Sequence, residues 1–496
     1  MARPNNQESL QRCLTLADLI EGLGGIRPSN LELPVSLVID SRKAEPGTVF
    51  LAFRGENVDG HAFVSDAFTR GAVAAVVDAA AFAADVSILD LTQDPQPGVA
   101  VDPPVIIRVP DVLQSLQRAA AFWRQQFDVR VIGITGSVGK TTTKEVTTRV
   151  LQQRYRVLHS TGSYNNEIGL PLTLLQLTSE HELVVLEMGM YVQGDIRSLA
   201  KIARPQIGIL TNVEPVHAER AGTLENIALG KRELVEALPP APEGLAILNY
   251  DDPRVRAMAE VAQARVFTYG LDPQADLWAD EVESLGLEGM RARLHYGQES
   301  WDVFAPLLGR HSVHTLLRAA AVGLTSGLSW QEIIVGLQTP GAQLRLVSVR
   351  GPRQSLVLDD TYNSSPPSAL AALNLLADLG ASRLGAPGLG GRGIAVLGDM
   401  LELGKYEEDG HLTVGCHTAA VAAQLVTVGP RGALIARGAR SCGMSSEQVH
   451  EVANNEEALA CLLALLEPND VILVKGSRAM HMEEIVQALV RAAGEQ

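Results

Sequence analysis

The residues with the clearest chemical potential lie between Gly133 and Thr143, in the segment GITGSVGKTTT. An apolar run precedes this segment and a helical pattern follows it, which is the setting of a phosphate-binding loop. Glycines let backbone N–H groups approach phosphates, a lysine adds positive charge at the β- and γ-phosphates, and a hydroxyl suits Mg²⁺. The segment departs from the strict GxxxxGK[ST] pattern, because Ile134 occupies the first glycine position. We expect ATP to bind through Gly136, Ser137, Val138, Gly139, Lys140, Thr141 and Thr142, with Lys140 catalytic and Thr141 on the metal.

Three further side chains follow the next strand patterns along the chain. Glu187 ends the run LVVLEMG, where a carboxylate can hold Mg²⁺ beside the γ-phosphate. His217 follows the run QIGILTNV, and Lys231 lies in LGKREL. A single histidine, lysine or strand-end glutamate is more often solvated than functional. Residue type alone therefore leaves both interpretations open for each of the three.

These residues need a scaffold, and the pattern around them predicts one. From Val129 onward, buried-strand patterns alternate with helical ones, and we expect helices at Lys140–Gln152, Asp195–Ile202 and Leu224–Leu238. Such alternation predicts βαβ units in a largely parallel sheet. Ligands of these sheets bind beyond the carboxyl ends of the strands, where the candidate residues fall.

The flanking regions predict two more α/β domains. Apolar runs at residues 35–39, 48–53, 72–77 and 105–109 indicate a small N-terminal domain, with a surface loop at 94–104. The runs SLVLDD, GIAVLGDM, QLVTVG and DVILVKGS, which begin near Ser355, predict a doubly wound, Rossmann-like domain with a flexible glycine-rich loop at 385–393. The expected fold is α/β, with domains at residues 1–108, 109–338 and 339–496.

The composition of the chain disfavours several classes of binding partner and indicates a cell compartment. The chain has 496 residues, 41 basic and 57 acidic, and its net charge of -16 disfavours nucleic acid or an anionic membrane as the main partner. The four cysteines show neither metal-ligand spacing nor a CxxC pair, so a reduced compartment fits. With no signal-type start and no long apolar stretch, we expect a cytoplasmic protein that does not insert into membranes.

Taken together, the motifs resemble those of the Mur ligases over essentially the whole chain. The N-terminal segment IDSRKAEPGTVFLAFRGENVDGHAF carries the family's DSR signature at Asp40, Ser41 and Arg42, which implies binding of a uridine diphosphate group. SYNNEIGLPLTLL, LEMGM and the His217/Lys231 pair match the central domain. LDDTYNSSPPS, AVLGDMLELG and LVKGSRAMHMEEIV are similar to the dipeptide-adding members, and no DNPR motif of the diamino-acid-adding members is present.

The resemblance implies an ATP-dependent ligase of peptidoglycan synthesis. It would join D-alanyl-D-alanine to a UDP-N-acetylmuramoyl-tripeptide (UDP-MurNAc-tripeptide) through an acyl phosphate, as a monomer with two Mg²⁺ ions. It also implies that CO₂ carbamylates Lys231, which then holds a metal ion with His217. The remaining implied contacts are to the nucleotide (Asn249, Asp252, Arg345 and Asp360) and to the substrates (Asn165, Asn166, Tyr362 and Asn363).

One departure and two alternatives remain. The family usually shows HNxxN where this chain has His311-Ser312-Val313-His314-Thr315, so the adenine contacts of the two asparagines do not carry over. A related amide ligase, either diamino-acid-adding or similar to folylpolyglutamate synthase, would share the phosphate loop and Lys231. A nucleotide-driven switch would hydrolyse ATP without forming a peptide bond, and it would leave the DSR segment without a purpose.

Overall fold

The computed structural model describes residues 12–55, 58–78, 86–93, 101–216, 218–340, 347–380 and 391–494. It divides into two compact units. The first unit holds residues 1–133, 155–189 and 194–207, and the second holds residues 134–154, 190–193 and 208–496. The strands form three sheets, in agreement with an α/β fold.

The N-terminal sheet has five parallel strands in the order β1-β2-β3-β5-β4. The bounds are β1 (Ser36–Val38), β2 (Thr48–Leu51), β3 (Ala74–Val77), β5 (Val105–Arg108) and β4 (Ser87–Asp90). The helical segments here are α1 (Leu16–Gly24), η1 (Ser41–Lys43), η2 (Gly60–Phe63), α2 (Val64–Thr69) and α3 (Val112–Arg124). Helix α1 starts in a capping box, in which Thr15 and Asp18 satisfy each other's backbone N–H groups. All four apolar runs expected in this region are strands.

The central sheet has nine strands in the order β14-β13-β12-β11-β10-β9-β6-β8-β7. The bounds are β6 (Arg130–Thr135), β7 (Val157–His159), β8 (Leu183–Glu187), β9 (Ile207–Leu210), β10 (Leu245–Asn249), β11 (Arg265–Gly270), β12 (Leu277–Ser284), β13 (Met290–Tyr296) and β14 (Glu299–Ala305). Strands β12, β13 and β14 are antiparallel, an extension that the strand–helix alternation did not predict.

Helices of this region agree with the sequence pattern. Helix α4 runs from Lys140–Gln152, as expected, while α6 (Asp195–Ala203) and α8 (Leu224–Glu236) differ from expectation by one or two residues at an end. The other helical segments are α5 (Gly169–Leu174), α7 (Ala218–Ala221), α9 (Pro253–Arg256), η3 (Ala257–Val261), η4 (Gly286–Glu288), η5 (Arg310–Ser312), α10 (Val313–Thr325) and α11 (Trp330–Gln338). Helix α10 packs against α4, the helix that opens with Lys140.

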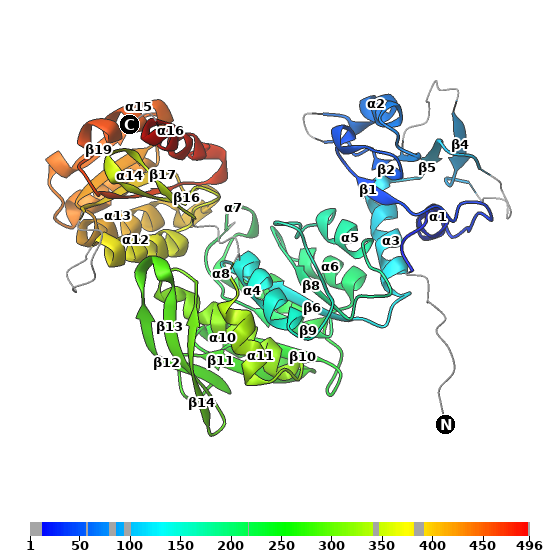
Figure 1. The fold of residues 1–496 in the computed structure, drawn as a ribbon, viewed down its shortest axis with the longest axis horizontal. Coiled ribbons are helices and arrows are strands. Elements are labelled where there is room, and N and C mark those ends of the chain that lie inside the picture. The colour runs from blue at the N-terminus through cyan, green and yellow to red at the C-terminus, as the bar shows by residue number, and fades with distance from the viewer. Residues whose placement is uncertain are drawn as a thin grey trace. The chain divides into compact units, whose positions relative to one another are not determined.

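The C-terminal sheet has the order β15-β16-β20-β17-β18-β19, and all its pairs except β15–β16 are parallel. The bounds are β15 (Val347–Arg350), β16 (Leu356–Asp360), β17 (Gly393–Gly398), β18 (Gln424–Val428), β19 (Val449–Val452) and β20 (Val471–Lys475). The helical segments are η6 (Pro352–Gln354), α12 (Pro366–Gly380), η7 (Gly404–Tyr406), α13 (Glu407–Val421), α14 (Gly432–Ser441), η8 (Ser446–Gln448), α15 (Asn455–Leu465), η9 (Arg478–Met480) and α16 (Glu483–Gly494). Figure 1 shows α15 and α16 on one side of this sheet and α12 and α13 on the other, and a separate apolar core fills each side. The domain is doubly wound, as expected.

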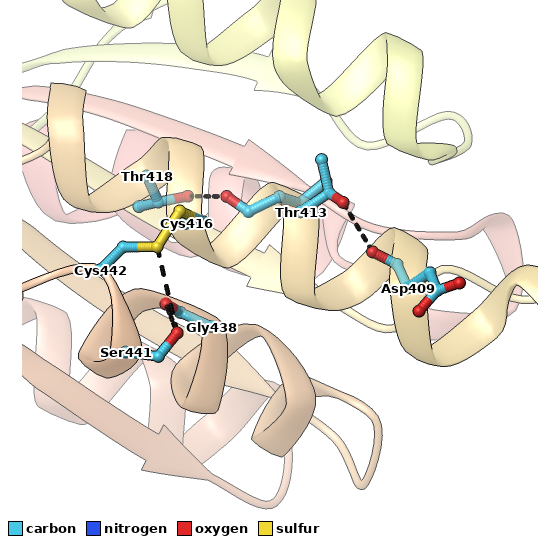
Figure 2. Close-up of a disulfide and its surroundings, with 8 residues drawn as sticks. Asp409, Thr413, Cys416, Thr418, Gly438, Ser441 and Cys442 are labelled. Carbon is cyan, nitrogen blue, oxygen red and sulfur yellow. Dashed lines mark hydrogen bonds between the residues drawn. A yellow bond between two sulfur atoms is a disulfide. The ribbon is translucent and has the colours of Figure 1, made fainter.

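Two cysteines of the C-terminal domain form a disulfide bond. Cys416 of α13 and Cys442, directly after α14, have Cα atoms 5.1 Å apart, and their sulfur atoms are bonded (Figure 2). The cysteine spacing, which we interpreted as fitting a reduced compartment, did not predict this pair, because packing of α13 on α14 brings together residues 26 positions apart. Cys13 and Cys461 are free thiols.

Three other predictions concern the loops, membrane insertion and the domain boundaries. Most of the expected loops at 94–104 and 385–393 lie outside the described residues. Among the helices that the structure describes, none has the length and apolarity that crossing a bilayer requires. The domain boundaries at 108/109 and 338/339 stay a prediction.

Candidate nucleotide and substrate sites

The predicted phosphate loop connects β6 to α4. Gly136 and Gly139 both have positive φ, at 145° and 84°, which favours glycine. A side-chain carbon on Gly136 would lie 1.8 Å from Oγ1 of Thr211, so no larger residue fits there. The ammonium group of Lys140 donates to the carbonyl oxygens of Gly136, at 2.9 Å, and Ser137, at 3.2 Å. The seven residues from Gly136 to Thr142 thus form one loop and helix start, as expected.

The segment after β9 holds this loop in place, and we call residues 211–214 the anchor segment. The N–H of Ser137 donates to the carbonyl of Asn212 at 3.0 Å, and the N–H of Val138 donates to Oδ1 of Asn212 at 2.9 Å. Thr211 donates its hydroxyl to the carbonyl of Val138 at 2.7 Å. Sequence reasoning missed these partners, although polar residues at the end of the apolar run QIGIL were a signal.

Asn249 and Asp252 act on the anchor segment. Nδ2 of Asn249 donates to the carbonyl of Thr211 at 2.8 Å, and Oδ2 of Asp252 accepts the N–H of Val213 at 2.7 Å. Asp252 also caps α9. Both residues were expected at the nucleotide. That role stays a prediction, and the hydrogen bonds described here fix the anchor segment, which in turn holds the phosphate loop.

Lys231 lies on α8 with a side chain that is almost fully buried, at 5% residue exposure. Burial lowers its pKa well below the usual value, and the positive charge of Lys140 lowers it further. In the described part of the chain, no carboxylate pairs with this amine. Burial therefore favours the neutral amine over the ammonium, and the neutral amine is the form that can react with CO₂.

Glu187 and the two predicted asparagines belong to the first unit. Glu187 ends β8 fully buried, and its Oε1 accepts a hydrogen bond from Nδ2 of Asn165 at 2.7 Å. Oδ1 of Asn166 accepts the N–H of Gly169 at 2.9 Å, at the start of α5. Asn165 therefore orients the carboxylate, whereas Asn166 stabilises a helix start.

The DSR residues form a compact turn in the N-terminal domain. Asp40 caps η1 by accepting the N–H of Arg42, and its carboxylate pairs with the guanidinium of Arg42 at 2.8 Å. Hydrogen bonds from Arg42 lower the pKa of Asp40 to about 2. Ser41 is buried, whereas the side chain of Arg42 is 81% exposed. The turn presents an arginine whose carboxylate partner holds it in one orientation.

A second cluster lies at the carboxyl ends of β16 and β20. The buried ammonium of Lys475 lies 2.6 Å from Oδ2 of Asp360 and donates to the carbonyl of Asn363 at 2.8 Å. The guanidinium of Arg478 lies over the ring of Tyr362, 5.4 Å from its centroid. Asp360 was expected at the nucleotide, and Tyr362 and Asn363 at the substrates; these roles stay predictions, and Lys475 and Arg478 were not singled out. The lysine in VKGS at the end of a strand was the available signal.

The HSVHT segment lies at the start of α10 and makes its own contacts. Ser312 donates to the carbonyl of Leu308 at 2.7 Å, and Thr315 accepts a hydrogen bond from Arg318 at 2.9 Å. His314 lies 2.7 Å from Oδ2 of Asp251. The hydroxyls that stand in place of the expected asparagines therefore already have partners, in residues on either side of this segment.

Two predicted residues, His217 and Arg345, lie outside the described residues. Within the described ranges, no three His, Cys, Asp or Glu side chains cluster in a way that could hold a metal ion. The buried carboxylate of Glu187 and the hydroxyl of Thr141 are hard oxygen donors, which fit Mg²⁺. Lys231 fits only as a carbamate, because an ammonium or amine is a poor ligand for this ion.

A phosphate loop at the carboxyl edge of a parallel sheet, with a doubly wound domain after it, defines a nucleotide-dependent α/β enzyme. The chain belongs to the Mur ligase family. Residues 35–124 match the model described as "Mur ligase family, catalytic domain", residues 134–323 match "Mur ligase middle domain", and residues 344–478 match "Mur ligase, glutamate ligase domain".

Several full-length relatives of this chain share one name. The UDP-N-acetylmuramoyl-tripeptide–D-alanyl-D-alanine ligase of Synechocystis sp. is 35% identical, with 92% of each chain covered. The Escherichia coli protein of that name is 32% identical, covering 96% of this chain and 98% of the relative. Among solved structures, MurF from Acinetobacter baumannii has a TM-score of 0.80 at 29% identity, with 96% and 98% of the two chains covered. MurF from Thermotoga maritima in complex with ADP has a TM-score of 0.74 at 26% identity, with 93% and 99% covered.

Proposed function

We propose that this chain joins D-alanyl-D-alanine to UDP-MurNAc-tripeptide with ATP, which yields ADP, phosphate and UDP-MurNAc-pentapeptide. The observation that carries the proposal is the Gly136–Thr142 loop, which hydrogen bonds to the anchor segment hold in place. The full-length relatives are named as ligases that join these two substrates. The alternative of a nucleotide switch has no comparable support, because it gives no role to the DSR turn or to the C-terminal cluster.

The chemistry follows from the weak electrophilicity of a carboxylate. A carboxylate oxygen of the tripeptide attacks the γ-phosphorus of ATP, the bond to the β-phosphate oxygen breaks, and an acyl phosphate forms with ADP. The amine of D-alanyl-D-alanine then attacks the acyl carbon, phosphate leaves with the bonding electrons, and the nitrogen loses a proton to water. The loop N–H groups and Lys140 bind and orient the phosphates during the first step.

The residues of the N- and C-terminal domains receive substrate roles in this proposal. The exposed guanidinium of Arg42, oriented by Asp40, suits the diphosphate of the UDP group. Tyr362, Asn363 and the neighbouring Arg478 suit the incoming dipeptide, whose free carboxylate needs a cation. His217 and Arg345 keep the metal and nucleotide roles that the family resemblance implies.

Lys231 is proposed to carry a carbamate. Its amine is buried, its pKa is lowered by burial, and it lies near enough to Lys140 for the two charges to interact. A neutral amine adds to CO₂ and loses a proton, which converts a repulsive cation into an anionic oxygen donor. Bound Mg²⁺ would neutralise phosphate charge, and the metal ligands Thr141, Glu187, His217 and Lys231, with two ions, stay a prediction.

The cell compartment and assembly are part of the proposal. The protein is proposed to act as a cytoplasmic monomer, in the compartment that supplies ATP. In that compartment Cys416 and Cys442 would be exposed to reducing conditions. Light scattering coupled to size exclusion, with and without a reductant, tests the monomer.

Product analysis decides the function. The purified chain is incubated with ATP, Mg²⁺ and UDP-MurNAc-tripeptide, together with D-alanyl-D-alanine or D-alanine. A parallel reaction contains the UDP-linked precursor that lacks the third residue, together with a diamino acid, and the product masses are measured by mass spectrometry. We expect pentapeptide and phosphate only with the dipeptide. Phosphate without a new amide bond favours the switch, and product with a diamino acid favours the related ligase.

A further inference from the structure

Arg318 is a buried arginine without the partners that buried arginines usually have. It lies on α10 with 4% of its surface exposed. Arg124, which is 6% exposed, shows the ordinary arrangement. Its Nε, Nη1 and Nη2 atoms donate to the carbonyl oxygens of Ala203, Phe127 and Val129. A guanidinium satisfied in this way has a structural role.

The contacts of Arg318 are fewer. Nη2 donates to Oγ1 of Thr315 at 2.9 Å, the guanidinium carbon lies 5.8 Å from the ring centroid of Tyr269, and the guanidinium also interacts with the Tyr269 hydroxyl by hydrogen bonding. Nε is buried and has no acceptor among the described residues. No carboxylate in the described ranges forms an ion pair with this side chain. A buried cation with unused donors is unfavourable unless an anion completes its surroundings.

The position of the guanidinium indicates what that anion is. A side-chain carbon built on Gly139 would lie 3.3 Å from Nη2 of Arg318, so the guanidinium lies against the last loop residue before Lys140. This is the N-terminus of α4, where backbone N–H groups and the helix dipole favour negative charge. Helix α10 packs on α4 and carries the arginine to this place.

We propose that Arg318 donates hydrogen bonds to a phosphate oxygen of the bound nucleotide, as a binding residue in addition to the loop and Lys140. Thr315 holds the guanidinium in position through its hydroxyl. Thr315 occupies the position of the second asparagine of the HNxxN pattern. The proposal gives this threonine a function, because its hydroxyl is the acceptor that orients the arginine. It rests on the nucleotide site described under the proposed function.

Calorimetric titration with ADP tests the proposal on the full chain. Arg318→Met keeps the length and apolar stem of the side chain, Arg318→Lys keeps a charge without the planar fork, and Arg265→Ala on β11 removes an exposed charge as a control. We expect the Kd of ADP to rise about tenfold or more in Arg318→Met, in line with loss of a hydrogen bond to a charged group. Arg318→Lys should lose less, and Arg265→Ala should change less than about twofold, as expected for an exposed charge away from the site.

The dependence on salt separates a phosphate contact from a contact with the nucleoside. A phosphate-binding cation makes the Kd of ADP rise with KCl concentration, so Arg318→Met should show a shallower dependence than the unchanged protein. An unchanged Kd in Arg318→Met, or a weaker Kd with an unchanged salt dependence, would overturn the proposal.

Folding is measured on the same samples. Melting temperatures without ADP should be nearly equal, because the cation has few partners to lose. A lower melting temperature with unchanged ADP affinity would show a structural arginine and contradict the proposal. Should Arg318→Met fail to fold, Arg318→Lys decides by the same two criteria. If the unchanged protein itself did not bind ADP, the nucleotide site would be wrong, which is a separate result.

Discussion

Lys475 and Asp360 form an ion pair of 2.6 Å inside the C-terminal domain, and they join the carboxyl ends of two neighbouring parallel strands. The same two residues are direct partners in the register of β16 and β20. Since Lys475 also donates to the carbonyl of Asn363, the pair fixes the turn that presents Tyr362.

Removing one member of this pair should destabilise the domain strongly. We expect Lys475→Met to lower the free energy of unfolding by about 3–5 kcal/mol, because the buried carboxylate of Asp360 loses the positive charge that compensates it. The double variant Lys475→Met/Asp360→Leu should recover most of the loss. Arg437→Met, which breaks an exposed pair with Glu408, should cost about 1 kcal/mol or less. Urea denaturation measures all three, and equal effects of the buried and exposed changes would contradict the interpretation.

Lys140 should be required for turnover. We expect Lys140→Met to lower the rate of phosphate release by about a hundredfold or more, as for loss of a preorganised transition-state contact. Lys201→Met removes an exposed lysine of α6 and should keep the rate of the unchanged protein. Retention of more than half the rate in Lys140→Met would exclude the loop as the site of phosphoryl transfer.

The carbamate on Lys231 has a chemical signature. We expect Lys231→Ala to lose about tenfold or more in rate, and acetate or propionate to restore part of it by supplying the missing carboxylate. Removal of CO₂ from the buffers should slow the unchanged protein and leave the variant unaffected. Full activity of Lys231→Ala without any additive would refute the carbamate.

His411 should make the C-terminal domain sensitive to acid. Its Nε2 accepts the N–H of Met400 at 3.0 Å, and its Nδ1 lies 2.6 Å from the carbonyl of Glu407, so the buried ring is neutral. Burial lowers its pKa, and this outweighs the neighbouring carboxylates of Asp399 and Glu407, while Arg431 acts in the same direction as burial.

The sign of the effect follows from proton uptake. Below pH about 6.5 the unfolded chain protonates this histidine and the folded chain does not, so the free energy of unfolding falls as the pH falls. The contribution is fully present above that pH. His411→Asn should flatten the fall, and His481→Asn, at an exposed site, should not. Urea denaturation between pH 7.5 and 5 tests this, and parallel curves for all three proteins would contradict it.

The bond between Cys416 and Cys442 should stabilise the C-terminal domain. It closes a separation of 26 residues, for which loop-closure entropy gives about 2–4 kcal/mol. We therefore expect Cys416→Ser/Cys442→Ser to unfold at lower urea concentration than the oxidised protein. Cys13→Ser provides a control at a free thiol. A reductant should lower the stability by the same amount as the double substitution. If neither the reductant nor the double substitution changed the stability, the disulfide bond would not contribute to it.

Sequence patterns predicted those parts of the fold that depend on continuous burial. An apolar run marks strand β6, and the dipeptide Gly139-Lys140 marks the start of helix α4. Both elements were found where expected. Strand β12 was missed because its inward and outward residues alternate, which gives no continuous apolar run. Asn249 was expected near the nucleotide, which stays a prediction, but its hydrogen bond to the carbonyl of Thr211 could not be predicted, because it depends on the packing of β10 beside β9. The role of Arg318 was likewise invisible, because residues 139 and 318 meet only after α10 packs on α4.

In this structure the ammonium group of Lys140 already donates to the carbonyl groups of Gly136 and Ser137. An arriving nucleotide therefore competes with the protein's own backbone for this ammonium group. The free energy of nucleotide binding therefore reflects an exchange of hydrogen-bond partners at Lys140 and not the full strength of a new contact.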